Sequence, residues 1–339
     1  MPYLYDNVAV DEDLVEGAYN AINTCLRVKS GEKVTLITDE QTAPIAATIC
    51  HEAAKVGAAC SMFVLEQFAP RPHTDMPRPI LEDLETSQVS VYAVWGQPGE
   101  LRTRMQMTRV VTEHRLRHAH MVNVNRQIML EGMRADFHKV DEISTRVINL
   151  ARRAKKIRAR SAAGTNIVAE FSPNLKWLKT SGIITEEKWG NLPGGEVLTA
   201  PLTVEGTYVV DGVVGDYLCA KYGDLKKTPL TIHIEQGRMK EVHCTNEELA
   251  SEIWDYCHTD MNSDRVGEFA IGTNIHLRHV IGHILQDEKI PGVHIAFGHP
   301  YAEHTGADWS SSTHIDVVGS EFDIWIDDTQ VMQKGEFLL

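Results

Sequence analysis

The sequence lacks the motifs of several common catalytic and coenzyme-binding classes. It has no GxxxxGK[ST] phosphate loop, no GxGxxG after a strand, no GxSxG nucleophile elbow and no HExxH zinc-protease helix. His51 and Glu52 begin like the last of these, but Lys55 stands where the second histidine is required. Coenzyme-binding, serine-hydrolase and HExxH zinc-protease functions therefore have no support in the sequence.

Positive charge and long apolar runs are also scarce. The chain has 33 Lys and Arg against 47 Asp and Glu, a net charge of −14, which opposes binding to nucleic acids or anionic membranes. No apolar run is long enough to span a bilayer, and acidic residues stand near the start, where a signal peptide needs basic ones. We therefore expect a cytoplasmic protein with neither a nucleic-acid nor a membrane partner.

The cysteines do not have the spacing of a disulfide framework or of a metal site. The sequence has no CxxC pair, and its six cysteines are scattered: Cys25, Cys50, Cys60, Cys219, Cys244 and Cys257. In a chain of this length without an export signal, the pattern predicts reduced thiols that are mostly buried.

The N-terminal half has the pattern of a parallel α/β sheet. A β-branched run over 34–38 precedes a small-residue helix over 43–56, then Gly57 and a second apolar run over 60–65. Strand, helix and strand in this order predict a βαβ unit, and 90–96 predicts a third buried strand. The 339 residues suit two domains, and we expect the first to be an α/β domain over 1–155 that ends with a helix over 139–156.

Beyond residue 155 the pattern changes to alternation of polar and apolar residues between glycine-bearing turns. Segments such as GTYVVDG, LTIHIEQG and SEFDIWIDD are typical of antiparallel or mixed sheets. The fold class predicted for the whole chain is therefore α/β plus α+β. A parallel-sheet domain is followed by a mixed-sheet domain over 156–339.

Ligating side chains are concentrated beside glycines in this second half. His314 and Asp316 are the sharpest pair, because residues i and i+2 of a strand point to the same face. His294 also lies in strand-like sequence. Imidazoles together with carboxylates suit Zn²⁺, Mn²⁺, Co²⁺ or Fe²⁺, and carboxylates are able to bridge two ions.

Four blocks in this half resemble the signatures of the bacterial aminopeptidase T and aminopeptidase S family of metallopeptidases. The blocks are PGGEVLTAP from residue 193, GEFAIGTN from 267, DEKI with HIAFG from 287, and the His-x-Asp strand from 314. The resemblance implies a two-metal site, with Zn, Mn or Co as the ions. It assigns the metal ligands as Glu196, Glu268, His294, Tyr301, His314 and Asp316.

The sequence departs from that family at Gly195, where members carry a second glutamate before the valine, and the chain is shorter than a typical member. The closing His-x-Asp strand also resembles the mononuclear iron 2,5-dihydroxypyridine ring-cleaving dioxygenases, whose length is nearer to this one. Retention of Glu196 and Glu268 favours an aminopeptidase-like hydrolase. The alternative is an Fe(II) dioxygenase of hydroxylated aromatic rings.

Further histidines flank these blocks. His299 and His304, on either side of Tyr301, are the candidates for acid–base catalysis, and Tyr301 is a third. The spacing of His276, His279 and His283 predicts one face of a helix, close to the metal site but outside the ligand set. We expect a small-molecule or short-peptide substrate, and the resemblance implies a homodimer.

Overall fold

The computed structural model describes residues 8–339, which form two compact units. The first unit runs to His138 and also includes Gly182–Gly194. The second unit comprises Lys139–Ser181 and Gly195–Leu339. None of the helices in residues 8–339 combines the length and apolar composition that crossing a bilayer requires.

The first unit is built on a parallel sheet of five strands in the order β2-β1-β3-β4-β8. The strands are β1 (Lys33–Thr38), β2 (Ala59–Val64), β3 (Val89–Ala93), β4 (Arg117–His120) and β8 (Gly190–Asn191). The helices and helical turns are η2 (Glu12–Leu14), α1 (Val15–Tyr19), η3 (Asn20–Cys25), α2 (Ala43–Val56), η4 (Leu65–Gln67), α3 (Arg78–Leu84), α4 (Leu101–Glu113), α5 (Arg126–Leu130) and η5 (Gly132–Arg134). The βαβ start predicted from the sequence is confirmed.

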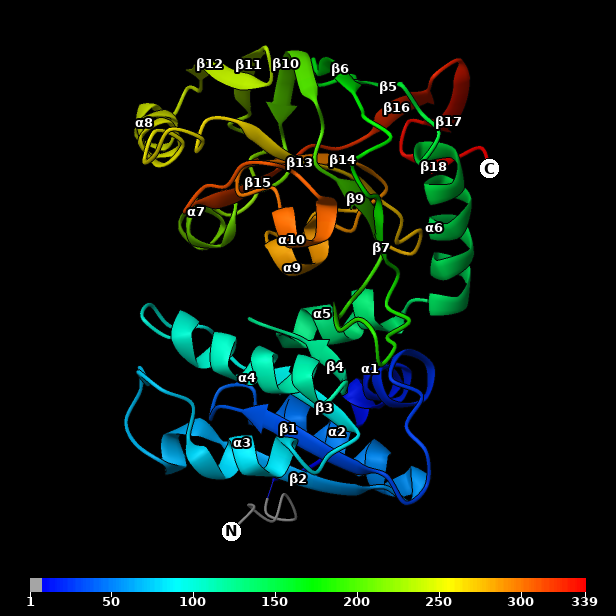
Figure 1. Ribbon diagram of the computed structural model, residues 1–339, viewed down its shortest axis with the longest axis vertical. Helices are drawn as coiled ribbons and strands as arrows, with labels where there is room; N and C mark the ends of the chain where they lie inside the picture. Colours follow the sequence, from blue (N-terminus) through cyan, green and yellow to red (C-terminus); the bar gives the residue numbers. More distant parts are fainter. Residues whose placement is uncertain (1–7) are drawn as a thin grey trace. The chain divides into compact units, whose positions relative to one another are not determined.

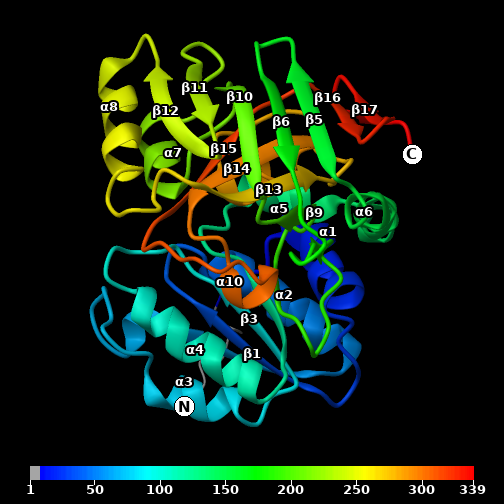
Figure 2. The same ribbon diagram turned by 45° about the horizontal axis from the view of Figure 1, so that its top comes forward.

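Local sequence explains this arrangement. Helix α2 has a proline in its first turn and ends at Gly57, whose left-handed φ of +86° suits a residue without a side chain. Helix α2 covers one face of the sheet, while α3 and α4 cover the other (Figures 1 and 2). Ile37, Phe63 and Tyr92 pack against α3 and α4 in a single apolar cluster. Two-sided coverage of this kind is why the strands read as nearly continuous apolar runs.

One expectation for the first unit is corrected. Cys50 in α2 and Cys60 in β2 form a disulfide, so the six cysteines are not all reduced. The fold brings these two residues, ten apart in sequence, to a Cα separation of 5.6 Å. The histidine-rich segment around His118 forms the buried strand β4, where the His118 Nδ1 atom and the Ser90 hydroxyl are hydrogen-bonded at 2.8 Å.

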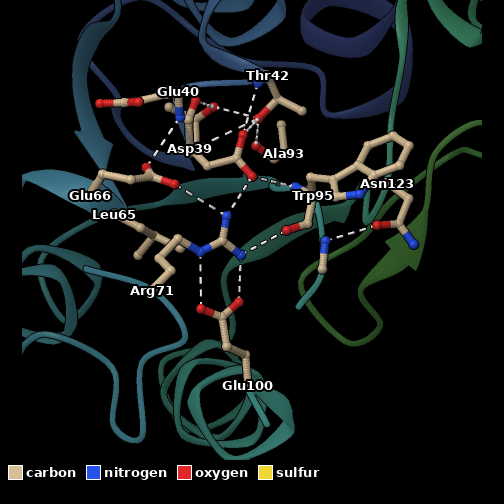
Figure 3. A network of polar contacts seen from close by, with 12 residues as sticks. Asp39, Glu40, Thr42, Leu65, Glu66, Arg71, Ala93, Trp95, Glu100 and Asn123 are labelled. Atoms are coloured by element: carbon tan, nitrogen blue, oxygen red, sulfur yellow. Dashed lines mark hydrogen bonds and ion pairs between the residues drawn. The ribbon is translucent and has the colours of Figure 1, made fainter. Parts of the chain in front are cut away.

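Arg71 is the centre of a buried polar network at the edge of this sheet where the strands have their carboxyl ends (Figure 3). Arg71 forms two bonds with Glu100, at 2.9 and 2.5 Å, and one of 2.8 Å with Asp39, which follows β1. Its remaining contacts are the Trp95 carbonyl, after β3, at 2.7 Å and Glu66, after β2, at 3.4 Å. Strand order reverses between β1 and β3, which is where doubly wound folds hold ligands. Here protein side chains fill that position.

The second unit contains two antiparallel sheets, as the alternating pattern predicted. The eight-stranded sheet has the order β12-β11-β10-β6-β5-β16-β17-β18, and the five-stranded sheet has the order β15-β14-β13-β9-β7. The strands of the larger sheet are β5 (Lys156–Ser161), β6 (Asn166–Glu170), β10 (Thr203–Val210), β11 (Leu230–Glu235), β12 (Arg238–His243), β16 (Phe322–Ile326), β17 (Thr329–Gln333) and β18 (Glu336–Phe337). Those of the smaller sheet are β7 (Leu178–Thr180), β9 (Glu196–Thr199), β13 (Val266–Gly272), β14 (Gly292–Gly298) and β15 (His314–Val318).

One apolar core joins the two sheets of the second unit. Residues of the larger sheet, such as Ile167 and Ile232, share this core with Phe269 and Ile295 of the smaller one. The buried Tyr208 hydroxyl donates to the Val293 carbonyl at 2.6 Å and so ties β10 to β14. The helices of this unit are α6 (Phe137–Ala151), α7 (Asp216–Tyr222), α8 (Glu247–Tyr256), α9 (Ile284–Asp287) and α10 (Ala302–Thr305) (Figure 1). The core occupies one face of the smaller sheet and leaves the other for polar residues.

Candidate metal centre

Strand register brings the predicted ligands onto that polar face of the five-stranded sheet. Glu268 in β13 and Asp316 in β15 both pair with Ala296 of β14, so their side chains flank it on one face. His294 precedes Ala296 by two residues and therefore shares the same face. His314 stands two residues before Asp316, and Glu196 in β9 pairs with Gly272, four residues after Glu268. Alternation and register together place five candidate ligands on one surface.

Small residues stand between the ligands on this surface. Ala270, Gly272, Ala296 and Gly298 occupy the neighbouring positions of the same face on β13 and β14. A Cβ at Gly272 would lie only 1.9 Å from the Ile290 carbonyl oxygen, so the chain after α9 can pack against β13 only because residue 272 is glycine. Glycine at residue 272 thus lets the segment after α9 lie against the polar face of the sheet.

Glu196, Glu268 and His294 form the first of two clusters with metal-ligand spacing, which we call cluster A. The His294 Nε2 atom lies 3.4 Å from Glu268 Oε1 and 3.6 Å from Glu196 Oε2. One ligand atom from each residue lies within 4.8 Å of the other two. All three side chains are buried, with 2% of the His294 side chain and 6% of each glutamate exposed.

Glu268, His314 and Asp316 form the second, cluster B, within the same separation. The His314 Nε2 atom lies 3.5 Å from Asp316 Oδ1 and 3.9 Å from Glu268 Oε2. Cluster B is the more accessible, since 21% of the His314 side chain and 17% of the Asp316 side chain are exposed. Glu268 belongs to both clusters and presents a different carboxylate oxygen to each, which is the arrangement of a bridging ligand.

The residues present fit divalent cations. The His294 Nε2 atom is buried and has no hydrogen-bond partner in the part of the chain that the structure describes, although two carboxylates face it. A buried nitrogen without a partner costs free energy that a bound ion would recover. The His314 Nδ1 atom contacts the His299 carbonyl at 2.9 Å, which orients the ring with Nε2 toward the carboxylates. Two imidazoles and several carboxylates are the donor set of Zn²⁺, Mn²⁺, Co²⁺ or Fe²⁺.

The carboxylates control protonation of both histidines when no cation is bound. Burial opposes the imidazolium form of His294, but the neighbouring carboxylates, Glu268 foremost, outweigh it and raise its pKa to about 9. Burial likewise opposes the charge on His314, while Asp316 and Glu268 raise its pKa to about 10. For Asp316 the raising effect of burial is overcome by His314, and its pKa falls to about 2. The site thus attracts positive charge strongly.

Two further residues of the site, Glu288 and Lys289, were not selected from the sequence. Glu288 shares metal-ligand spacing with His294 and Asp316, and burial raises its pKa to about 8. The Lys289 Nζ atom lies 2.7 Å from Glu196 Oε1 and 2.5 Å from Glu288 Oε1. Both residues stand within the DEKI block used for the resemblance, but an adjacent Glu-Lys pair is common on surfaces and gave no separate signal.

The predicted acid–base residues lie at the exposed end of the same surface. Tyr301 has its ring centroid 4.8 Å from that of His314, and burial of its hydroxyl together with Glu268 and Asp316 raises its pKa. The His299 Nδ1 atom accepts a hydrogen bond from the Tyr301 backbone N–H at 3.0 Å. The exposed His304 pairs with Glu303 at 3.8 Å and belongs to none of the clusters found in residues 8–339. The structure therefore brings Tyr301 and His299 close to cluster B, and leaves His304 at the rim.

Two sequence features of this region are explained or corrected. Gly195 has a φ of +132°, and a Cβ there would lie 2.7 Å from the Asn274 Cβ, so this backbone excludes the glutamate that the resembling family carries. The helix predicted through His276, His279 and His283 is absent from that stretch of the described chain, where helix α9 begins only at Ile284. Gly282, with a φ of +76°, breaks the helical path before it.

Comparisons with known proteins agree with this geometry. The family model described as thermophilic metalloprotease (M29) matches residues 134–337. A solved structure of wild-type AmpT from Thermus thermophilus is 17% identical, with a TM-score of 0.71 over 97% of this chain and 99% of that one. The 2,5-dihydroxypyridine dioxygenase from Pseudomonas putida KT2440 is 16% identical, with a TM-score of 0.68 over 97% of this chain and 98% of that one. No curated protein matches the sequence. At these identities the two solved structures share the fold with this chain, and that likeness does not distinguish their chemistries.

Proposed function

Because the chain belongs to the thermophilic metalloprotease family (M29), with its family match covering residues 134–337, we propose that it is an aminopeptidase-like metal-dependent hydrolase. It would cleave an amide or related C–N bond in a small molecule or short peptide. The observation that carries the proposal is the pair of clusters A and B, which share Glu268. A carboxylate that offers one oxygen to each of two adjacent ligand sets suits a pair of Zn, Mn or Co ions.

Divalent ions at these clusters would supply a water of lowered pKa and a Lewis acid for the substrate carbonyl. The chain's own residues would hold these ions and transfer the protons. Glu196 would hold a cation through Oε2, because its Oε1 atom is occupied by the Thr180 hydroxyl at 2.7 Å and by Lys289. His314, oriented by the His299 carbonyl, would complete the accessible side of the site together with Asp316.

Proton transfer needs a group whose pKa lies near neutrality. Glu288 meets this requirement, since burial raises its pKa to about 8 and it lies within 4.8 Å of ligand atoms of His294 and Asp316. Tyr301 and His299 stand beside His314 on the exposed side, where a leaving amine would depart, and His304 is farther out. We assign Glu288 as the carboxylate that holds the proton, with Tyr301 and His299 contacting the substrate.

The second candidate is a mononuclear Fe(II) ring-cleaving dioxygenase that acts on a hydroxylated N-heteroaromatic such as 2,5-dihydroxypyridine. The observation in its favour is the Lys289 ammonium, which already neutralises Glu196. Against it, His294 has both Glu196 and Glu268 within 3.6 Å, which is more carboxylates than a site of two histidines and one carboxylate uses. The hydrolase is therefore the better supported proposal.

The substitution Glu196→Gln is expected to affect the hydrolase and the dioxygenase differently, and so distinguishes the two proposed functions. The amide has nearly the same size as the carboxylate but is a poorer ligand for a hard cation. For the hydrolase we expect the metal content to fall from about two ions per chain to about one, and amide hydrolysis to fall by about 100-fold or more. Metal content is measured by plasma mass spectrometry on anaerobically purified protein, and hydrolysis with aminoacyl amide and short-peptide substrates.

Glu268→Gln serves as the comparison, because Glu268 lies in both clusters and its loss should impair either enzyme. If Glu196→Gln keeps its metal and its turnover while Glu268→Gln loses both, the hydrolase proposal is wrong. About one iron per chain with oxygen-dependent turnover would support the dioxygenase instead.

We also propose that the protein is a homodimer, since closed two-fold assemblies are the commonest oligomers of soluble enzymes. Light scattering at micromolar concentration should give about twice the mass of the 339-residue chain. A monomeric mass throughout that range would refute the assignment. Electrophoretic mobility shift with duplex DNA and sedimentation with anionic vesicles should both be negative, because the net charge is −14.

A further inference from the structure

Lys289 places a fixed positive charge inside the metal centre. Only 1% of its side chain is exposed, and its Nζ atom lies between Glu196 Oε1 at 2.7 Å and Glu288 Oε1 at 2.5 Å. The Glu196 carboxylate at this distance stabilises the charged form of the buried amine. The ammonium therefore lies beside a carboxylate that a cation at cluster A must share.

The backbone holds this lysine in place. The Lys289 carbonyl accepts a hydrogen bond from the Asn274 N–H at 3.0 Å, just after β13, and its own N–H donates to the Gln286 carbonyl at 2.9 Å. The absence of a side chain at Gly272 lets residues 289 and 290 lie directly against β13. With both backbone groups engaged and its side chain buried, Lys289 cannot turn its charge out to solvent.

The charge acts unequally on the two clusters. Cluster A includes Glu196, which is the direct partner of Lys289. In cluster B the ion pairs of Glu268 and Asp316 are with histidines, which a metal ion can deprotonate and use as ligands. Cluster B is also the more exposed of the two. An incoming divalent ion thus meets carboxylates at cluster B whose ion pairs are with histidines, and at cluster A one carboxylate that is already paired with a lysine ammonium.

We propose that Lys289 is a fixed positive charge that makes the metal centre bind its two ions in order. Cluster B would bind one divalent ion tightly, and cluster A would bind a second ion weakly. The inference rests on the proposed metal site, but it concerns binding and not the reaction. An ammonium close to Glu196 repels a divalent ion bound there, and low effective dielectric strengthens this repulsion in a buried site. The lysine thereby sets whether the chain works with one ion or with two at a given metal concentration.

The test is a titration of the metal-free, full-length protein with Mn²⁺, in which free Mn²⁺ is counted by electron paramagnetic resonance. Mn²⁺ is chosen because oxygen ligands suit it better than cysteine thiolates do. Wild type should bind two ions in separate steps, with the second roughly 100-fold weaker than the first. Lys289→Met removes the charge at similar length, and should tighten the second step by about tenfold or more. The first step should change far less.

Two controls separate charge from packing. Lys289→Arg keeps the positive charge and should retain the unequal steps. Lys221→Met removes an exposed lysine that pairs with Glu248 and Glu252 elsewhere in the second unit, and should leave both steps unchanged. The steps are assigned with two site variants: His314→Ala should remove the tight step and Glu196→Gln the weak one.

Equal affinities in wild type, or a second step that Lys289→Met leaves unchanged or weakens, would overturn the inference. If Lys289→Met fails to fold, the ratio of the two wild-type steps and their assignment by His314→Ala and Glu196→Gln still decide it. Unequal binding without amide hydrolysis would refute only the proposed function. Hydrolysis with two equal binding steps would refute only the role of Lys289.

Discussion

Replacing either His314 or Asp316 with alanine is expected to abolish activity and to weaken metal binding by more than about 100-fold, since losing even an outer partner of a ligand costs 10–100-fold. Each substitution removes a ligand of cluster B, the accessible half of the proposed centre. The fold should persist, because both side chains are partly exposed and lie on the polar face of the sheet. Metal content, turnover and circular dichroism on the same preparations measure the three effects.

Strand β12 provides a matched control for this experiment. Glu241 and His243 also form a carboxylate–imidazole pair two residues apart, with an Nε2–Oε2 distance of 3.1 Å, but 64% and 70% of their side chains are exposed. No cluster with metal-ligand spacing in residues 8–339 includes them. Alanine at either position should leave metal content and turnover unchanged. Retention of both properties in His314→Ala or Asp316→Ala would contradict the metal-site assignment.

Arg71→Met is expected to lower the free energy of unfolding of the first unit by about 3–5 kcal/mol, the usual cost of removing one partner from a buried ion-pair network. Only 3% of the Arg71 side chain is exposed, and the substitution leaves the carboxylates of Asp39 and Glu100 buried without their cation. Urea denaturation measures the free energy of unfolding. Amide hydrogen exchange in β1 and β3 assigns the loss to the edge of the sheet that Arg71 holds (Figure 3).

The same network predicts how this effect depends on pH. Burial tends to raise the pKa of Glu100, but the hydrogen bonds and charge of Arg71 outweigh burial and lower it. A lowered carboxyl pKa contributes stability above the unfolded pKa of about 4.3, and that contribution is lost as the pH falls through the folded value. The difference between wild type and Arg71→Met should therefore shrink below about pH 4.

Arg78→Met is the control for Arg71→Met. Arg78 forms an exposed pair with Glu82, and such pairs contribute about 0–1 kcal/mol. If Arg71→Met is no more destabilising than Arg78→Met, the network at the carboxyl edge does not hold the first unit together.

The local periodicity of the sequence was sufficient to predict several features of this protein. The βαβ start followed from apolar runs separated by a small-residue helix, because a parallel strand covered on both faces must be apolar on both. The antiparallel second half followed from strict alternation. Alternation also placed His314 and Asp316 on one face, since their separation of two residues is the period of a strand. His294 was selected because it lies in strand-like sequence. The other candidate ligands came from the resemblance of whole blocks to a known family, because their individual positions carry no periodic signal.

Other features depend on contacts between residues far apart in the sequence, and only the tertiary structure decided them. Pairing of β9, β13, β14 and β15 determines that Glu268 faces both histidines and links the two clusters. The chain reversal after α9 buries Lys289 against Glu196, 93 positions earlier in the numbering, where sequence alone shows an ordinary Glu-Lys pair. Arg71 meets carboxylates that follow different strands for the same reason. Periodicity indicates which face of its own helix or strand a side chain lies on. Strand order and register determine which side chains meet, and the charge balance of this metal centre depends on those meetings.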